Sequence, residues 1–286
     1  MNHSLSRLGL IITYRCNATC RHCFFESDQG RKEVMDMDLA RNAINEAAEL
    51  GASWVSFTGG EPFLELSLLE SLIRYAKERG MKVEVVTNGH WGKAVETIRV
   101  TLESLIEHGL DVLNLSIDDF HQEQIPLDYV KNVYNAAVIL GLNIVIMTTV
   151  KKESKITSNT IPSLLGDEKI QVLGHPLIRD PNALLIETPI TPVGRAKNIR
   201  EIEESLFTQV NCPIILKDIG IDPSGAVFPC CGPLASKLSL GRLKDSSLSE
   251  LIEEAYENPV LSSIREGVSI YGAYTSKCHA CVSLFE

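Results

Sequence analysis

The stretch that decides the fold is Leu8-Gly-Leu-Ile-Ile-Thr-Tyr-Arg-Cys16-Asn-Ala-Thr-Cys20-Arg-His-Cys23, in which an apolar run leads into three cysteines. The run predicts a β-strand over Leu8–Thr13, and the cysteines of the following loop are separated by three and then two residues. Three thiolates on a 4Fe-4S cube would leave one iron open to a chelating amino acid, whereas an electron-transfer cluster has four protein ligands. A zinc knuckle or three buried thiols are alternatives that the spacing alone leaves open.

Downstream of this stretch, short β-branched runs alternate with segments of helical periodicity, which is typical of βα units around a parallel sheet. Gly51, Gly80, Gly109 and Gly141 follow four of the helical segments, where helix C-caps are expected. In a βα barrel the loop after each strand lies at the catalytic face. We therefore predict an α/β domain over residues 1–190 with six strands, at Leu8–Thr13, Trp54–Thr58, Lys82–Thr87, Val112–Ile117, Asn143–Val150 and Gln171–Ile178.

Composition excludes several classes of protein. The chain has 286 residues, 44% of them hydrophobic, so it can bury one large core and a smaller unit. Its net charge is -10 and no run of Lys or Arg exceeds a pair, which argues against a nucleic-acid partner. No signal-type run precedes Cys16 and no apolar stretch reaches the roughly 18 residues of a membrane span. We expect a soluble, cytoplasmic protein without a membrane partner.

A glycine-rich run ends the second predicted strand. In Thr58-Gly59-Gly60-Glu61-Pro62, the glycines allow close approach of the backbone to a ligand, and Glu61 can accept hydrogen bonds from an ammonium group. Alone, such a run could be a plain turn. At the same barrel face as the three cysteines, it indicates a ligand site.

These residues resemble the radical S-adenosylmethionine (SAM) superfamily. The resemblance rests on Cys16/Cys20/Cys23, on Gly59–Pro62 and on Thr87-Asn88-Gly89 after the third strand, and it covers Leu8 to roughly Val150. It implies a partial (β/α)6 TIM-like barrel, a 4Fe-4S cluster that binds SAM, and reductive cleavage of SAM to a 5'-deoxyadenosyl radical that abstracts a hydrogen atom. It also implies SAM contacts near Asn88, Ser116 and Thr148.

Other side chains near the predicted strand ends are candidates for the same site. Phe24 could pack near the adenine, and Arg195 could pair with the SAM carboxylate or be a surface arginine. Asp118 or Asp119 could bind ribose hydroxyls or a substrate amine, and His121 could relay a proton. The alternatives without a catalytic role are that Asp119 caps a turn and that His121 is an exposed side chain.

A second cysteine group lies near the C-terminus. Cys212, Cys230, Cys278 and Cys281 supply four thiolates, which by spacing alone suit either a zinc site or a complete cluster. Together with Gly225 and Leu240-Gly241, they resemble the SPASM/twitch extension of radical SAM enzymes, which implies an auxiliary 4Fe-4S cluster. The chain ends five residues after Cys281, so the resemblance is to the twitch form. We predict a linker helix over 191–211 and a twitch-type domain over 212–286.

Cys231 is the one cysteine without a cluster to bind. It could only occupy space beside a cluster ligand. Alternatively, it could donate a hydrogen atom to a substrate radical, since a thiol S–H bond is weaker than a backbone Cα–H bond. The pair Cys230-Cys231, with Asp218 upstream, resembles radical SAM peptide epimerases with a twitch-like cluster, in which one cysteine donates the hydrogen. Asp218 could orient a peptide amide or the thiol, or be a solvated loop acid.

The sequence therefore favours epimerisation of Cα centres in a ribosomally made peptide. The alternatives are an oxidoreductase, either a dehydrogenase or a peptide cross-linking enzyme with the auxiliary cluster as electron acceptor, and a non-catalytic iron-sulfur electron carrier. The expected partners are a peptide or small polar substrate and a flavodoxin- or ferredoxin-type electron donor.

Overall fold

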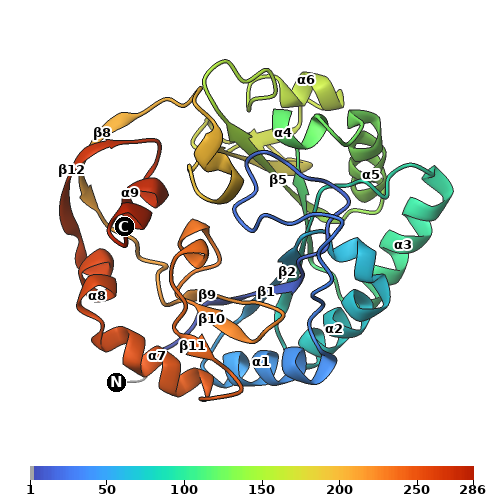
Figure 1. Cartoon of the computed structure of the whole chain (residues 1–286). Helices are drawn as coiled ribbons and strands as arrows, with labels where there is room; N and C mark the ends of the chain where they lie inside the picture. Colours follow the sequence, from blue (N-terminus) through green and yellow to red (C-terminus); the bar gives the residue numbers. More distant parts are fainter. Residues whose placement is uncertain (1–2) are drawn as a thin grey trace.

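The computed structural model describes residues 3–286, and its centre is a curved sheet of ten strands. Six parallel strands form the barrel wall in the order β1-β2-β3-β4-β5-β7, and β6 pairs outside β7. Figure 1 shows these strands around a central space with helices outside. Their bounds are Arg7–Thr13 (β1), Trp54–Gly59 (β2), Lys82–Thr87 (β3), Val112–Ser116 (β4), Asn143–Val150 (β5), Ile170–Val172 (β6) and Ala183–Pro189 (β7).

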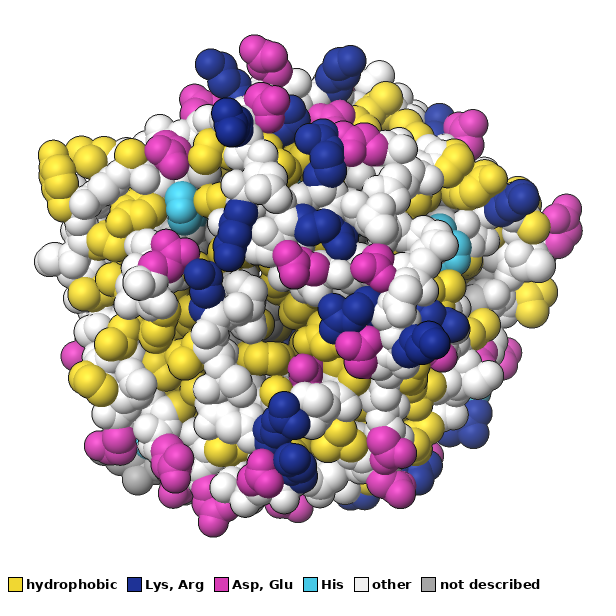
Figure 2. All heavy atoms as spheres, viewed as in Figure 1, with side chains coloured by type: hydrophobic (Ala, Val, Ile, Leu, Met, Phe, Trp, Pro, Cys, Tyr) yellow, Lys and Arg dark blue, Asp and Glu magenta, His cyan; other side chains and the backbone are white. Residues whose placement is uncertain are grey.

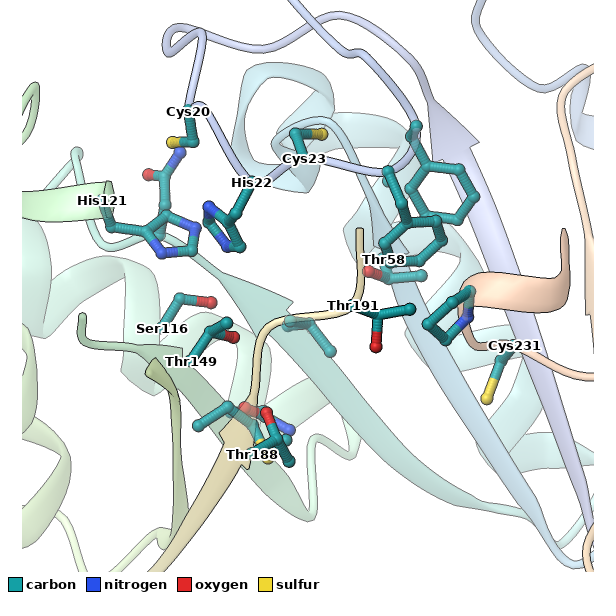
Figure 3. Close-up of a pocket in the computed structure, with 18 of the residues that line it drawn as sticks. Cys20, His22, Cys23, Thr58, Ser116, His121, Thr149, Thr188, Thr191 and Cys231 are labelled. Atoms are coloured by element: carbon teal, nitrogen blue, oxygen red, sulfur yellow. The ribbon is translucent and has the colours of Figure 1, made fainter. Parts of the chain in front are cut away.

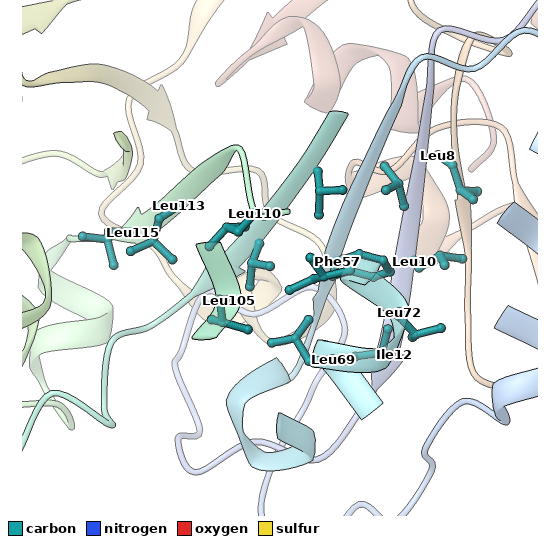
Figure 4. Close-up of a cluster of buried hydrophobic side chains, with 14 of the residues drawn as sticks. Leu8, Leu10, Ile12, Phe57, Leu69, Leu72, Leu105, Leu110, Leu113 and Leu115 are labelled. Carbon is teal, nitrogen blue, oxygen red and sulfur yellow. The ribbon is translucent and has the colours of Figure 1, made fainter. Parts of the chain in front are cut away.

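Helices cover the outer face of the barrel because each has one apolar face. Leu69 and Leu72 of the second helix, for example, are fully buried against Phe57 and the even-numbered residues of β1 (Figure 4). Asp36 caps the first helix by accepting from the backbone N–H groups of its first turn. The helices of this part are α1 (Met37–Glu49), α2 (Leu66–Glu78), α3 (Val95–His108), α4 (Asp119–Gln122), α5 (Leu127–Ile139) and α6 (Ile161–Leu165), with the 3-10 helix η1 at Pro62–Glu65.

The predicted sixth strand is wrong. Only Ile170–Val172 of that region is extended, and the strand beside β5 is β7, Ala183–Pro189. Gly174 has a φ of 88°, and the buried Gln171 side chain donates to the carbonyl of Val172 and accepts from the N–H of Ile178, which fixes a loop in place of a strand. Periodicity alone does not reveal such a side-chain contact.

The predicted linker helix over 191–211 is also wrong. This segment contains a 3-10 helix, η2 (Gly194–Asn198), and a strand, β8 (Ser205–Val210). Its charged residues lack helical apolar periodicity, while β8 buries Val210 and pairs antiparallel with β12 (Val268–Tyr274). The two strands form a separate two-stranded sheet.

The C-terminal region extends the barrel sheet. Strand β9 (Asp218–Ile221) pairs parallel with β1, and β10 (Ala226–Phe228) and β11 (Gly241–Arg242) follow it outward. The remaining elements are η3 (Pro233–Ser236), α7 (Leu248–Glu257), α8 (Pro259–Glu266) and α9 (Lys277–Ser283). A domain boundary at 212 stays a prediction, since this region shares a ladder with the barrel. Within the described residues, no helix is long and apolar enough to cross a membrane.

Candidate active site

The three N-terminal cysteines lie in the loop at the carboxyl end of β1, as the sequence predicts. The Cys16 N–H donates to the Asp28 carbonyl at 2.9 Å, and the Cys23 N–H donates to the Cys20 carbonyl at 3.1 Å. All three cysteines line a cavity of about 830 Å³ inside the barrel. Figure 3 shows Cys20 and Cys23 at one end of this cavity.

Residues of η2 pack on the cysteine loop. The Arg195 guanidinium donates from Nε to the Cys20 carbonyl and from Nη2 to the Ser27 carbonyl, both at 2.9 Å. A Cβ on Gly194 would lie 2.6 Å from Cα of Phe24, so the two backbones touch. Arg195 and Phe24 both line the cavity, and their contacts with SAM stay predictions.

The glycine pair at the end of β2 touches the same loop. A Cβ on Gly59 would lie 2.2 Å from the Thr13 carbonyl oxygen, and one on Gly60 would lie 2.1 Å from that of Arg15. The Gly60 N–H donates to Thr13 at 2.7 Å and the Glu61 N–H donates to Arg15 at 2.9 Å. The glycines therefore allow the loop after β2 to approach the cysteine loop closely. They also line the cavity.

Glu61 is fully buried and does not line the cavity. Its carboxylate accepts from the Thr87 hydroxyl and the Asn88 N–H, each at 2.8 Å, and from the Phe63 N–H at 3.1 Å. Burial raises the pKa of Glu61 to about 7. Glu61 thus fixes the end of β3, where Asn88 reaches the Cys16 sulfur at 3.8 Å, while the buried Pro62 begins η1. An ammonium contact for Glu61 stays a prediction.

Asp118 and His121, which follow β4, lie beside His22 of the cysteine loop. Asp118 caps α4 through the His121 N–H, and its Oδ2 lies 2.9 Å from His121 Nδ1 and 3.9 Å from His22 Nε2. Burial opposes ionisation of Asp118, but His121 outweighs it and lowers the pKa of the carboxyl to about 2. Burial likewise opposes protonation of His121, yet Asp118 raises its pKa, whereas burial lowers the pKa of His22 to about 4. His121 and His22 face the cavity, so His121 is placed where the sequence predicts a proton relay.

Alternation along the strands selects which side chains enter the cavity. On β5, Met147 and Thr149 line it, whereas Thr148 is fully buried on the opposite face and its hydroxyl has no partner among the described residues. Asp119 is also outside the cavity lining, and its carboxylate accepts from the Lys155 N–H at 2.8 Å. The structure therefore does not bring Thr148 or Asp119 to the site, but Asn88 and Ser116 do line it.

Three polar side chains inside the barrel were missed by the sequence analysis. Glu84 of β3 is 5% exposed and accepts from Arg7 at 2.8 Å, Ser56 at 2.8 Å and Asn114 at 2.9 Å. All four line the cavity. Polar residues that interrupt apolar strands at a period of two are the signal that could have found Ser56, Glu84 and Asn114.

Cys231 borders this polar group. A Cβ on Gly9 would lie 2.9 Å from the Cys231 Cβ, so a side chain there would displace the thiol. The Cys231 N–H donates to the Asp218 carbonyl at 3.1 Å. Burial raises the pKa of Cys231 to about 11. Figure 3 shows Cys231 at the other end of the cavity from Cys20 and Cys23. Asp218 contacts the Cys231 backbone through its carbonyl and does not line the cavity.

The second cysteine group is assembled from separate segments. Cys230 follows β10, Cys278 and Cys281 lie in α9, and Cys212 follows β8. Cys281 belongs to one buried apolar cluster against which Cys212 and Cys230 also pack, and α9, which carries Cys278, contacts β8 and η3. Cys278 also lines the large cavity.

The spacing of the cysteines suits clusters better than single ions. A tetrahedral zinc site with bonds of about 2.3 Å needs its sulfurs roughly 4 Å apart. Across residues 3–286, one group of three His, Cys, Asp or Glu residues has its ligand atoms within 4.8 Å of one another, and it consists of His22, Asp118 and His121. No three cysteine sulfurs of the described residues lie that close together. A 4Fe-4S cube, whose irons bind separate thiolates, accommodates the wider spacing of both cysteine groups.

Two family models match the sequence. The model described as the radical SAM superfamily matches residues 10–157, which is more than half of the chain. The chain belongs to the radical SAM superfamily. A SPASM model, described as an iron-sulfur cluster-binding domain, matches residues 212–282. This radical SAM enzyme therefore has SAM and two 4Fe-4S clusters as its cofactors, and the family and fold class inferred from the sequence are confirmed.

Similar proteins cover nearly the whole radical SAM chain. YydG of Bacillus subtilis (strain 168), named for peptide biosynthesis, is 27% identical over 95% of this chain and 89% of its own. A solved structure of anSMEcpe with AdoMet and a Cp18Cys peptide has a TM-score of 0.56 and 16% identity, covering 87% of this chain and 80% of that one. BtrN with AdoMet and 2-DOIA has a TM-score of 0.52 and 14% identity, covering 92% and 86%. These two structures support the fold alone.

Proposed function

We propose that this radical SAM enzyme epimerises Cα centres of a ribosomally made peptide, with Cys231 as hydrogen donor. When bound at Cys16, Cys20 and Cys23, the cluster and SAM supply the radical that removes a hydrogen atom from the substrate. The observation that carries the proposal is the position of Cys231. It lines the same cavity as those three cysteines and lies at the opposite end from Cys20 and Cys23. The four cysteines expected to bind the auxiliary cluster do not include it.

The chemistry of the thiol suits this position. A substrate carbon radical held between the two ends of the cavity can take a hydrogen atom from Cys231 on the face opposite to the abstraction, because the S–H bond is weaker than Cα–H. The carbon centre gains its hydrogen with inverted configuration, and Cys231 becomes a thiyl radical. One electron from a flavodoxin- or ferredoxin-type donor and one proton from water restore the thiol. Asp218 holds the Cys231 backbone during these steps.

A peptide substrate is supported by two comparisons. YydG is named for peptide biosynthesis, and the anSMEcpe structure contains a bound peptide. The cavity also offers hydroxyl groups that can bond peptide amides, among them Thr58, Thr149 and Thr188 in Figure 3.

Oxidation is the second candidate, because Cys278 belongs to the auxiliary cysteine group and also lines the cavity. A substrate radical would then lie near an electron acceptor, and the product would be a dehydrogenated or cross-linked peptide. Cys231 would be dispensable.

One experiment separates the two candidates. The anaerobically reconstituted enzyme is supplied with SAM, a reductant and the peptide encoded beside its gene in D2O, and the peptide is analysed by mass spectrometry and chiral amino-acid analysis. Epimerisation adds one mass unit per site, since the thiol exchanges its proton with solvent, whereas oxidation removes two.

Cys231→Ser is the matched variant, since its stronger O–H bond cannot donate. We expect it to form 5'-deoxyadenosine but no inverted residue. An unchanged yield of the inverted product from Cys231→Ser would show that another group is the donor.

A further inference from the structure

Over residues 3–286, the two-stranded sheet of β8 and β12 has unpaired outer edges. Helix α9 packs on both strands and α8 packs on β12, but no third strand pairs with either within the described residues. Leu206 of β8 is 62% exposed and lies opposite Ala273 of β12, and Tyr271 of the same strand is 82% exposed. Figure 2 shows hydrophobic side chains at the edge of the molecule where Figure 1 places these strands.

This sheet leads directly into the cavity. Strand β12 ends at Tyr274, which pairs with Ser205 of β8, and the residues that follow it, Ser276 to Cys278, line the cavity. The Ser276 hydroxyl lies 3.3 Å from that of Thr191, which also lines the cavity. The end of the sheet at Ser205 and Tyr274 is therefore the end beside the cavity.

The same end carries negative charge. Glu203 and Glu204 directly precede β8, are exposed, and form no ion pair with a described residue, whereas Glu201 lies 3.9 Å from Lys151. A chain that passes along β8 toward the cavity would cross these two carboxylates last. A basic side chain at that point of the chain would complement them.

We propose that the outer edge of β8 binds an extended segment of the peptide substrate as a third strand, which delivers the residue that follows to the cavity. Exposed strand edges accept a further strand, whose backbone supplies affinity. Antiparallel pairing, the more stable kind, makes the peptide run from Val210 toward Ser205, so the bound segment lies on the N-terminal side of the modified residue. Its apolar side chains contact Leu206 and Tyr271.

This inference rests on the proposed peptide substrate but is independent of whether the product is epimerised or oxidised. The test uses the reconstituted enzyme and two fluorescein-labelled probes, namely the full-length peptide encoded beside the gene and a form that lacks its N-terminal half. Fluorescence anisotropy under anaerobic conditions gives the Kd of each, without turnover.

We expect the truncated peptide to bind at least about tenfold more weakly than the full-length peptide. Leu206→Asp and the double variant Glu203→Lys/Glu204→Lys are expected to raise the Kd of the full-length peptide to a similar extent and to leave that of the truncated peptide within about twofold. Val100→Asp is the matched control, because Val100 on α3 is 67% exposed and far along the chain from the sheet.

Amide hydrogen exchange reports the backbone contact itself. The full-length peptide, but not the truncated one, is expected to slow deuterium uptake over Ser205–Val210. Equal affinities of the wild-type enzyme for the two peptides, failure to bind either, or unchanged uptake over β8 on full-length binding would overturn the proposal. A product two mass units lighter would overturn epimerisation and leave this docking surface intact.

Discussion

The two cysteine groups differ in how the chain assembles them. Cys16, Cys20 and Cys23 lie within eight residues of one loop, whereas the second group unites residues from Cys212 to Cys281. The first loop is held by contacts with two other strand ends and with η2. The second depends on the packing of β8, η3, α8 and α9 around a smaller apolar cluster. A compact motif can thus be read from sequence, while a dispersed one requires the fold.

The largest expected effect comes from removing one ligand of each group. Cys20→Ala should abolish 5'-deoxyadenosine formation, because SAM has no cluster to bind, while Cys281→Ala should lose about four of about eight irons per chain and still cleave SAM. Iron analysis and single-turnover assays measure both. Loss of SAM cleavage in a folded Cys281→Ala protein would show that the two groups are not independent.

A substitution at Gly59, whose backbone lies against that of Thr13, tests whether the end of β2 supports the loop of Cys16, Cys20 and Cys23. Gly59→Ala places a Cβ 2.2 Å from the Thr13 oxygen at a φ of 145°, and we expect a loss of roughly 3 kcal/mol or more in apparent unfolding free energy. Gly80→Ala is the control, since Gly80 has a φ of 76° but open space around it, and it should cost about 1 kcal/mol. Urea denaturation compares them; equal losses would mean that the approach can relax.

Arg195 tests the contact between the first loop and η2. Arg195→Lys removes the fork that binds two carbonyls, so we expect a loss of about 1–2 kcal/mol and a melting temperature lower by about 2–6 °C. Arg200→Lys, at an exposed position after η2, serves as the control. A melting temperature as high as that of the control would remove Arg195 from the support of the loop.

Asp111 provides a stability measurement at an ion-paired site away from both cysteine groups. Burial opposes ionisation, but hydrogen bonds from Lys77, the Val83 N–H and Lys82 outweigh it and lower the pKa of Asp111. A carboxyl group whose pKa is lower in the folded than in the unfolded state stabilises the protein at pH values above the unfolded-state pKa. That contribution is lost as the pH falls through the folded-state pKa. Asp111→Asn should cost under about 1 kcal/mol at about pH 6 and progressively less toward about pH 3. A difference that grows on acidification would contradict this.

The features that could be predicted from the sequence rest on contacts between residues close together in the chain. The strand before Cys16, the glycine pair and five of the six barrel strands follow from local patterns. The last strand was misplaced because Gln171 folds its own neighbours into a loop, and Thr148 was chosen in place of Thr149 because a strand's inward face is set by its register in the sheet. The close approach of Gly9 and Cys231 joins residues 222 positions apart in the chain (231 − 9), so no local pattern contains it.

The pairing of β1 with β9 also constrains the order in which the protein can be made. Strand β1 leaves the ribosome before β9, and 211 positions separate Arg7 from its β9 partner Asp218 (218 − 7). Until that partner is synthesised, one edge of β1 and the end of the barrel that holds Cys231 are open to solvent. The barrel that carries Cys16, Cys20 and Cys23 is therefore completed only after most of the chain exists, which favours cluster insertion after translation.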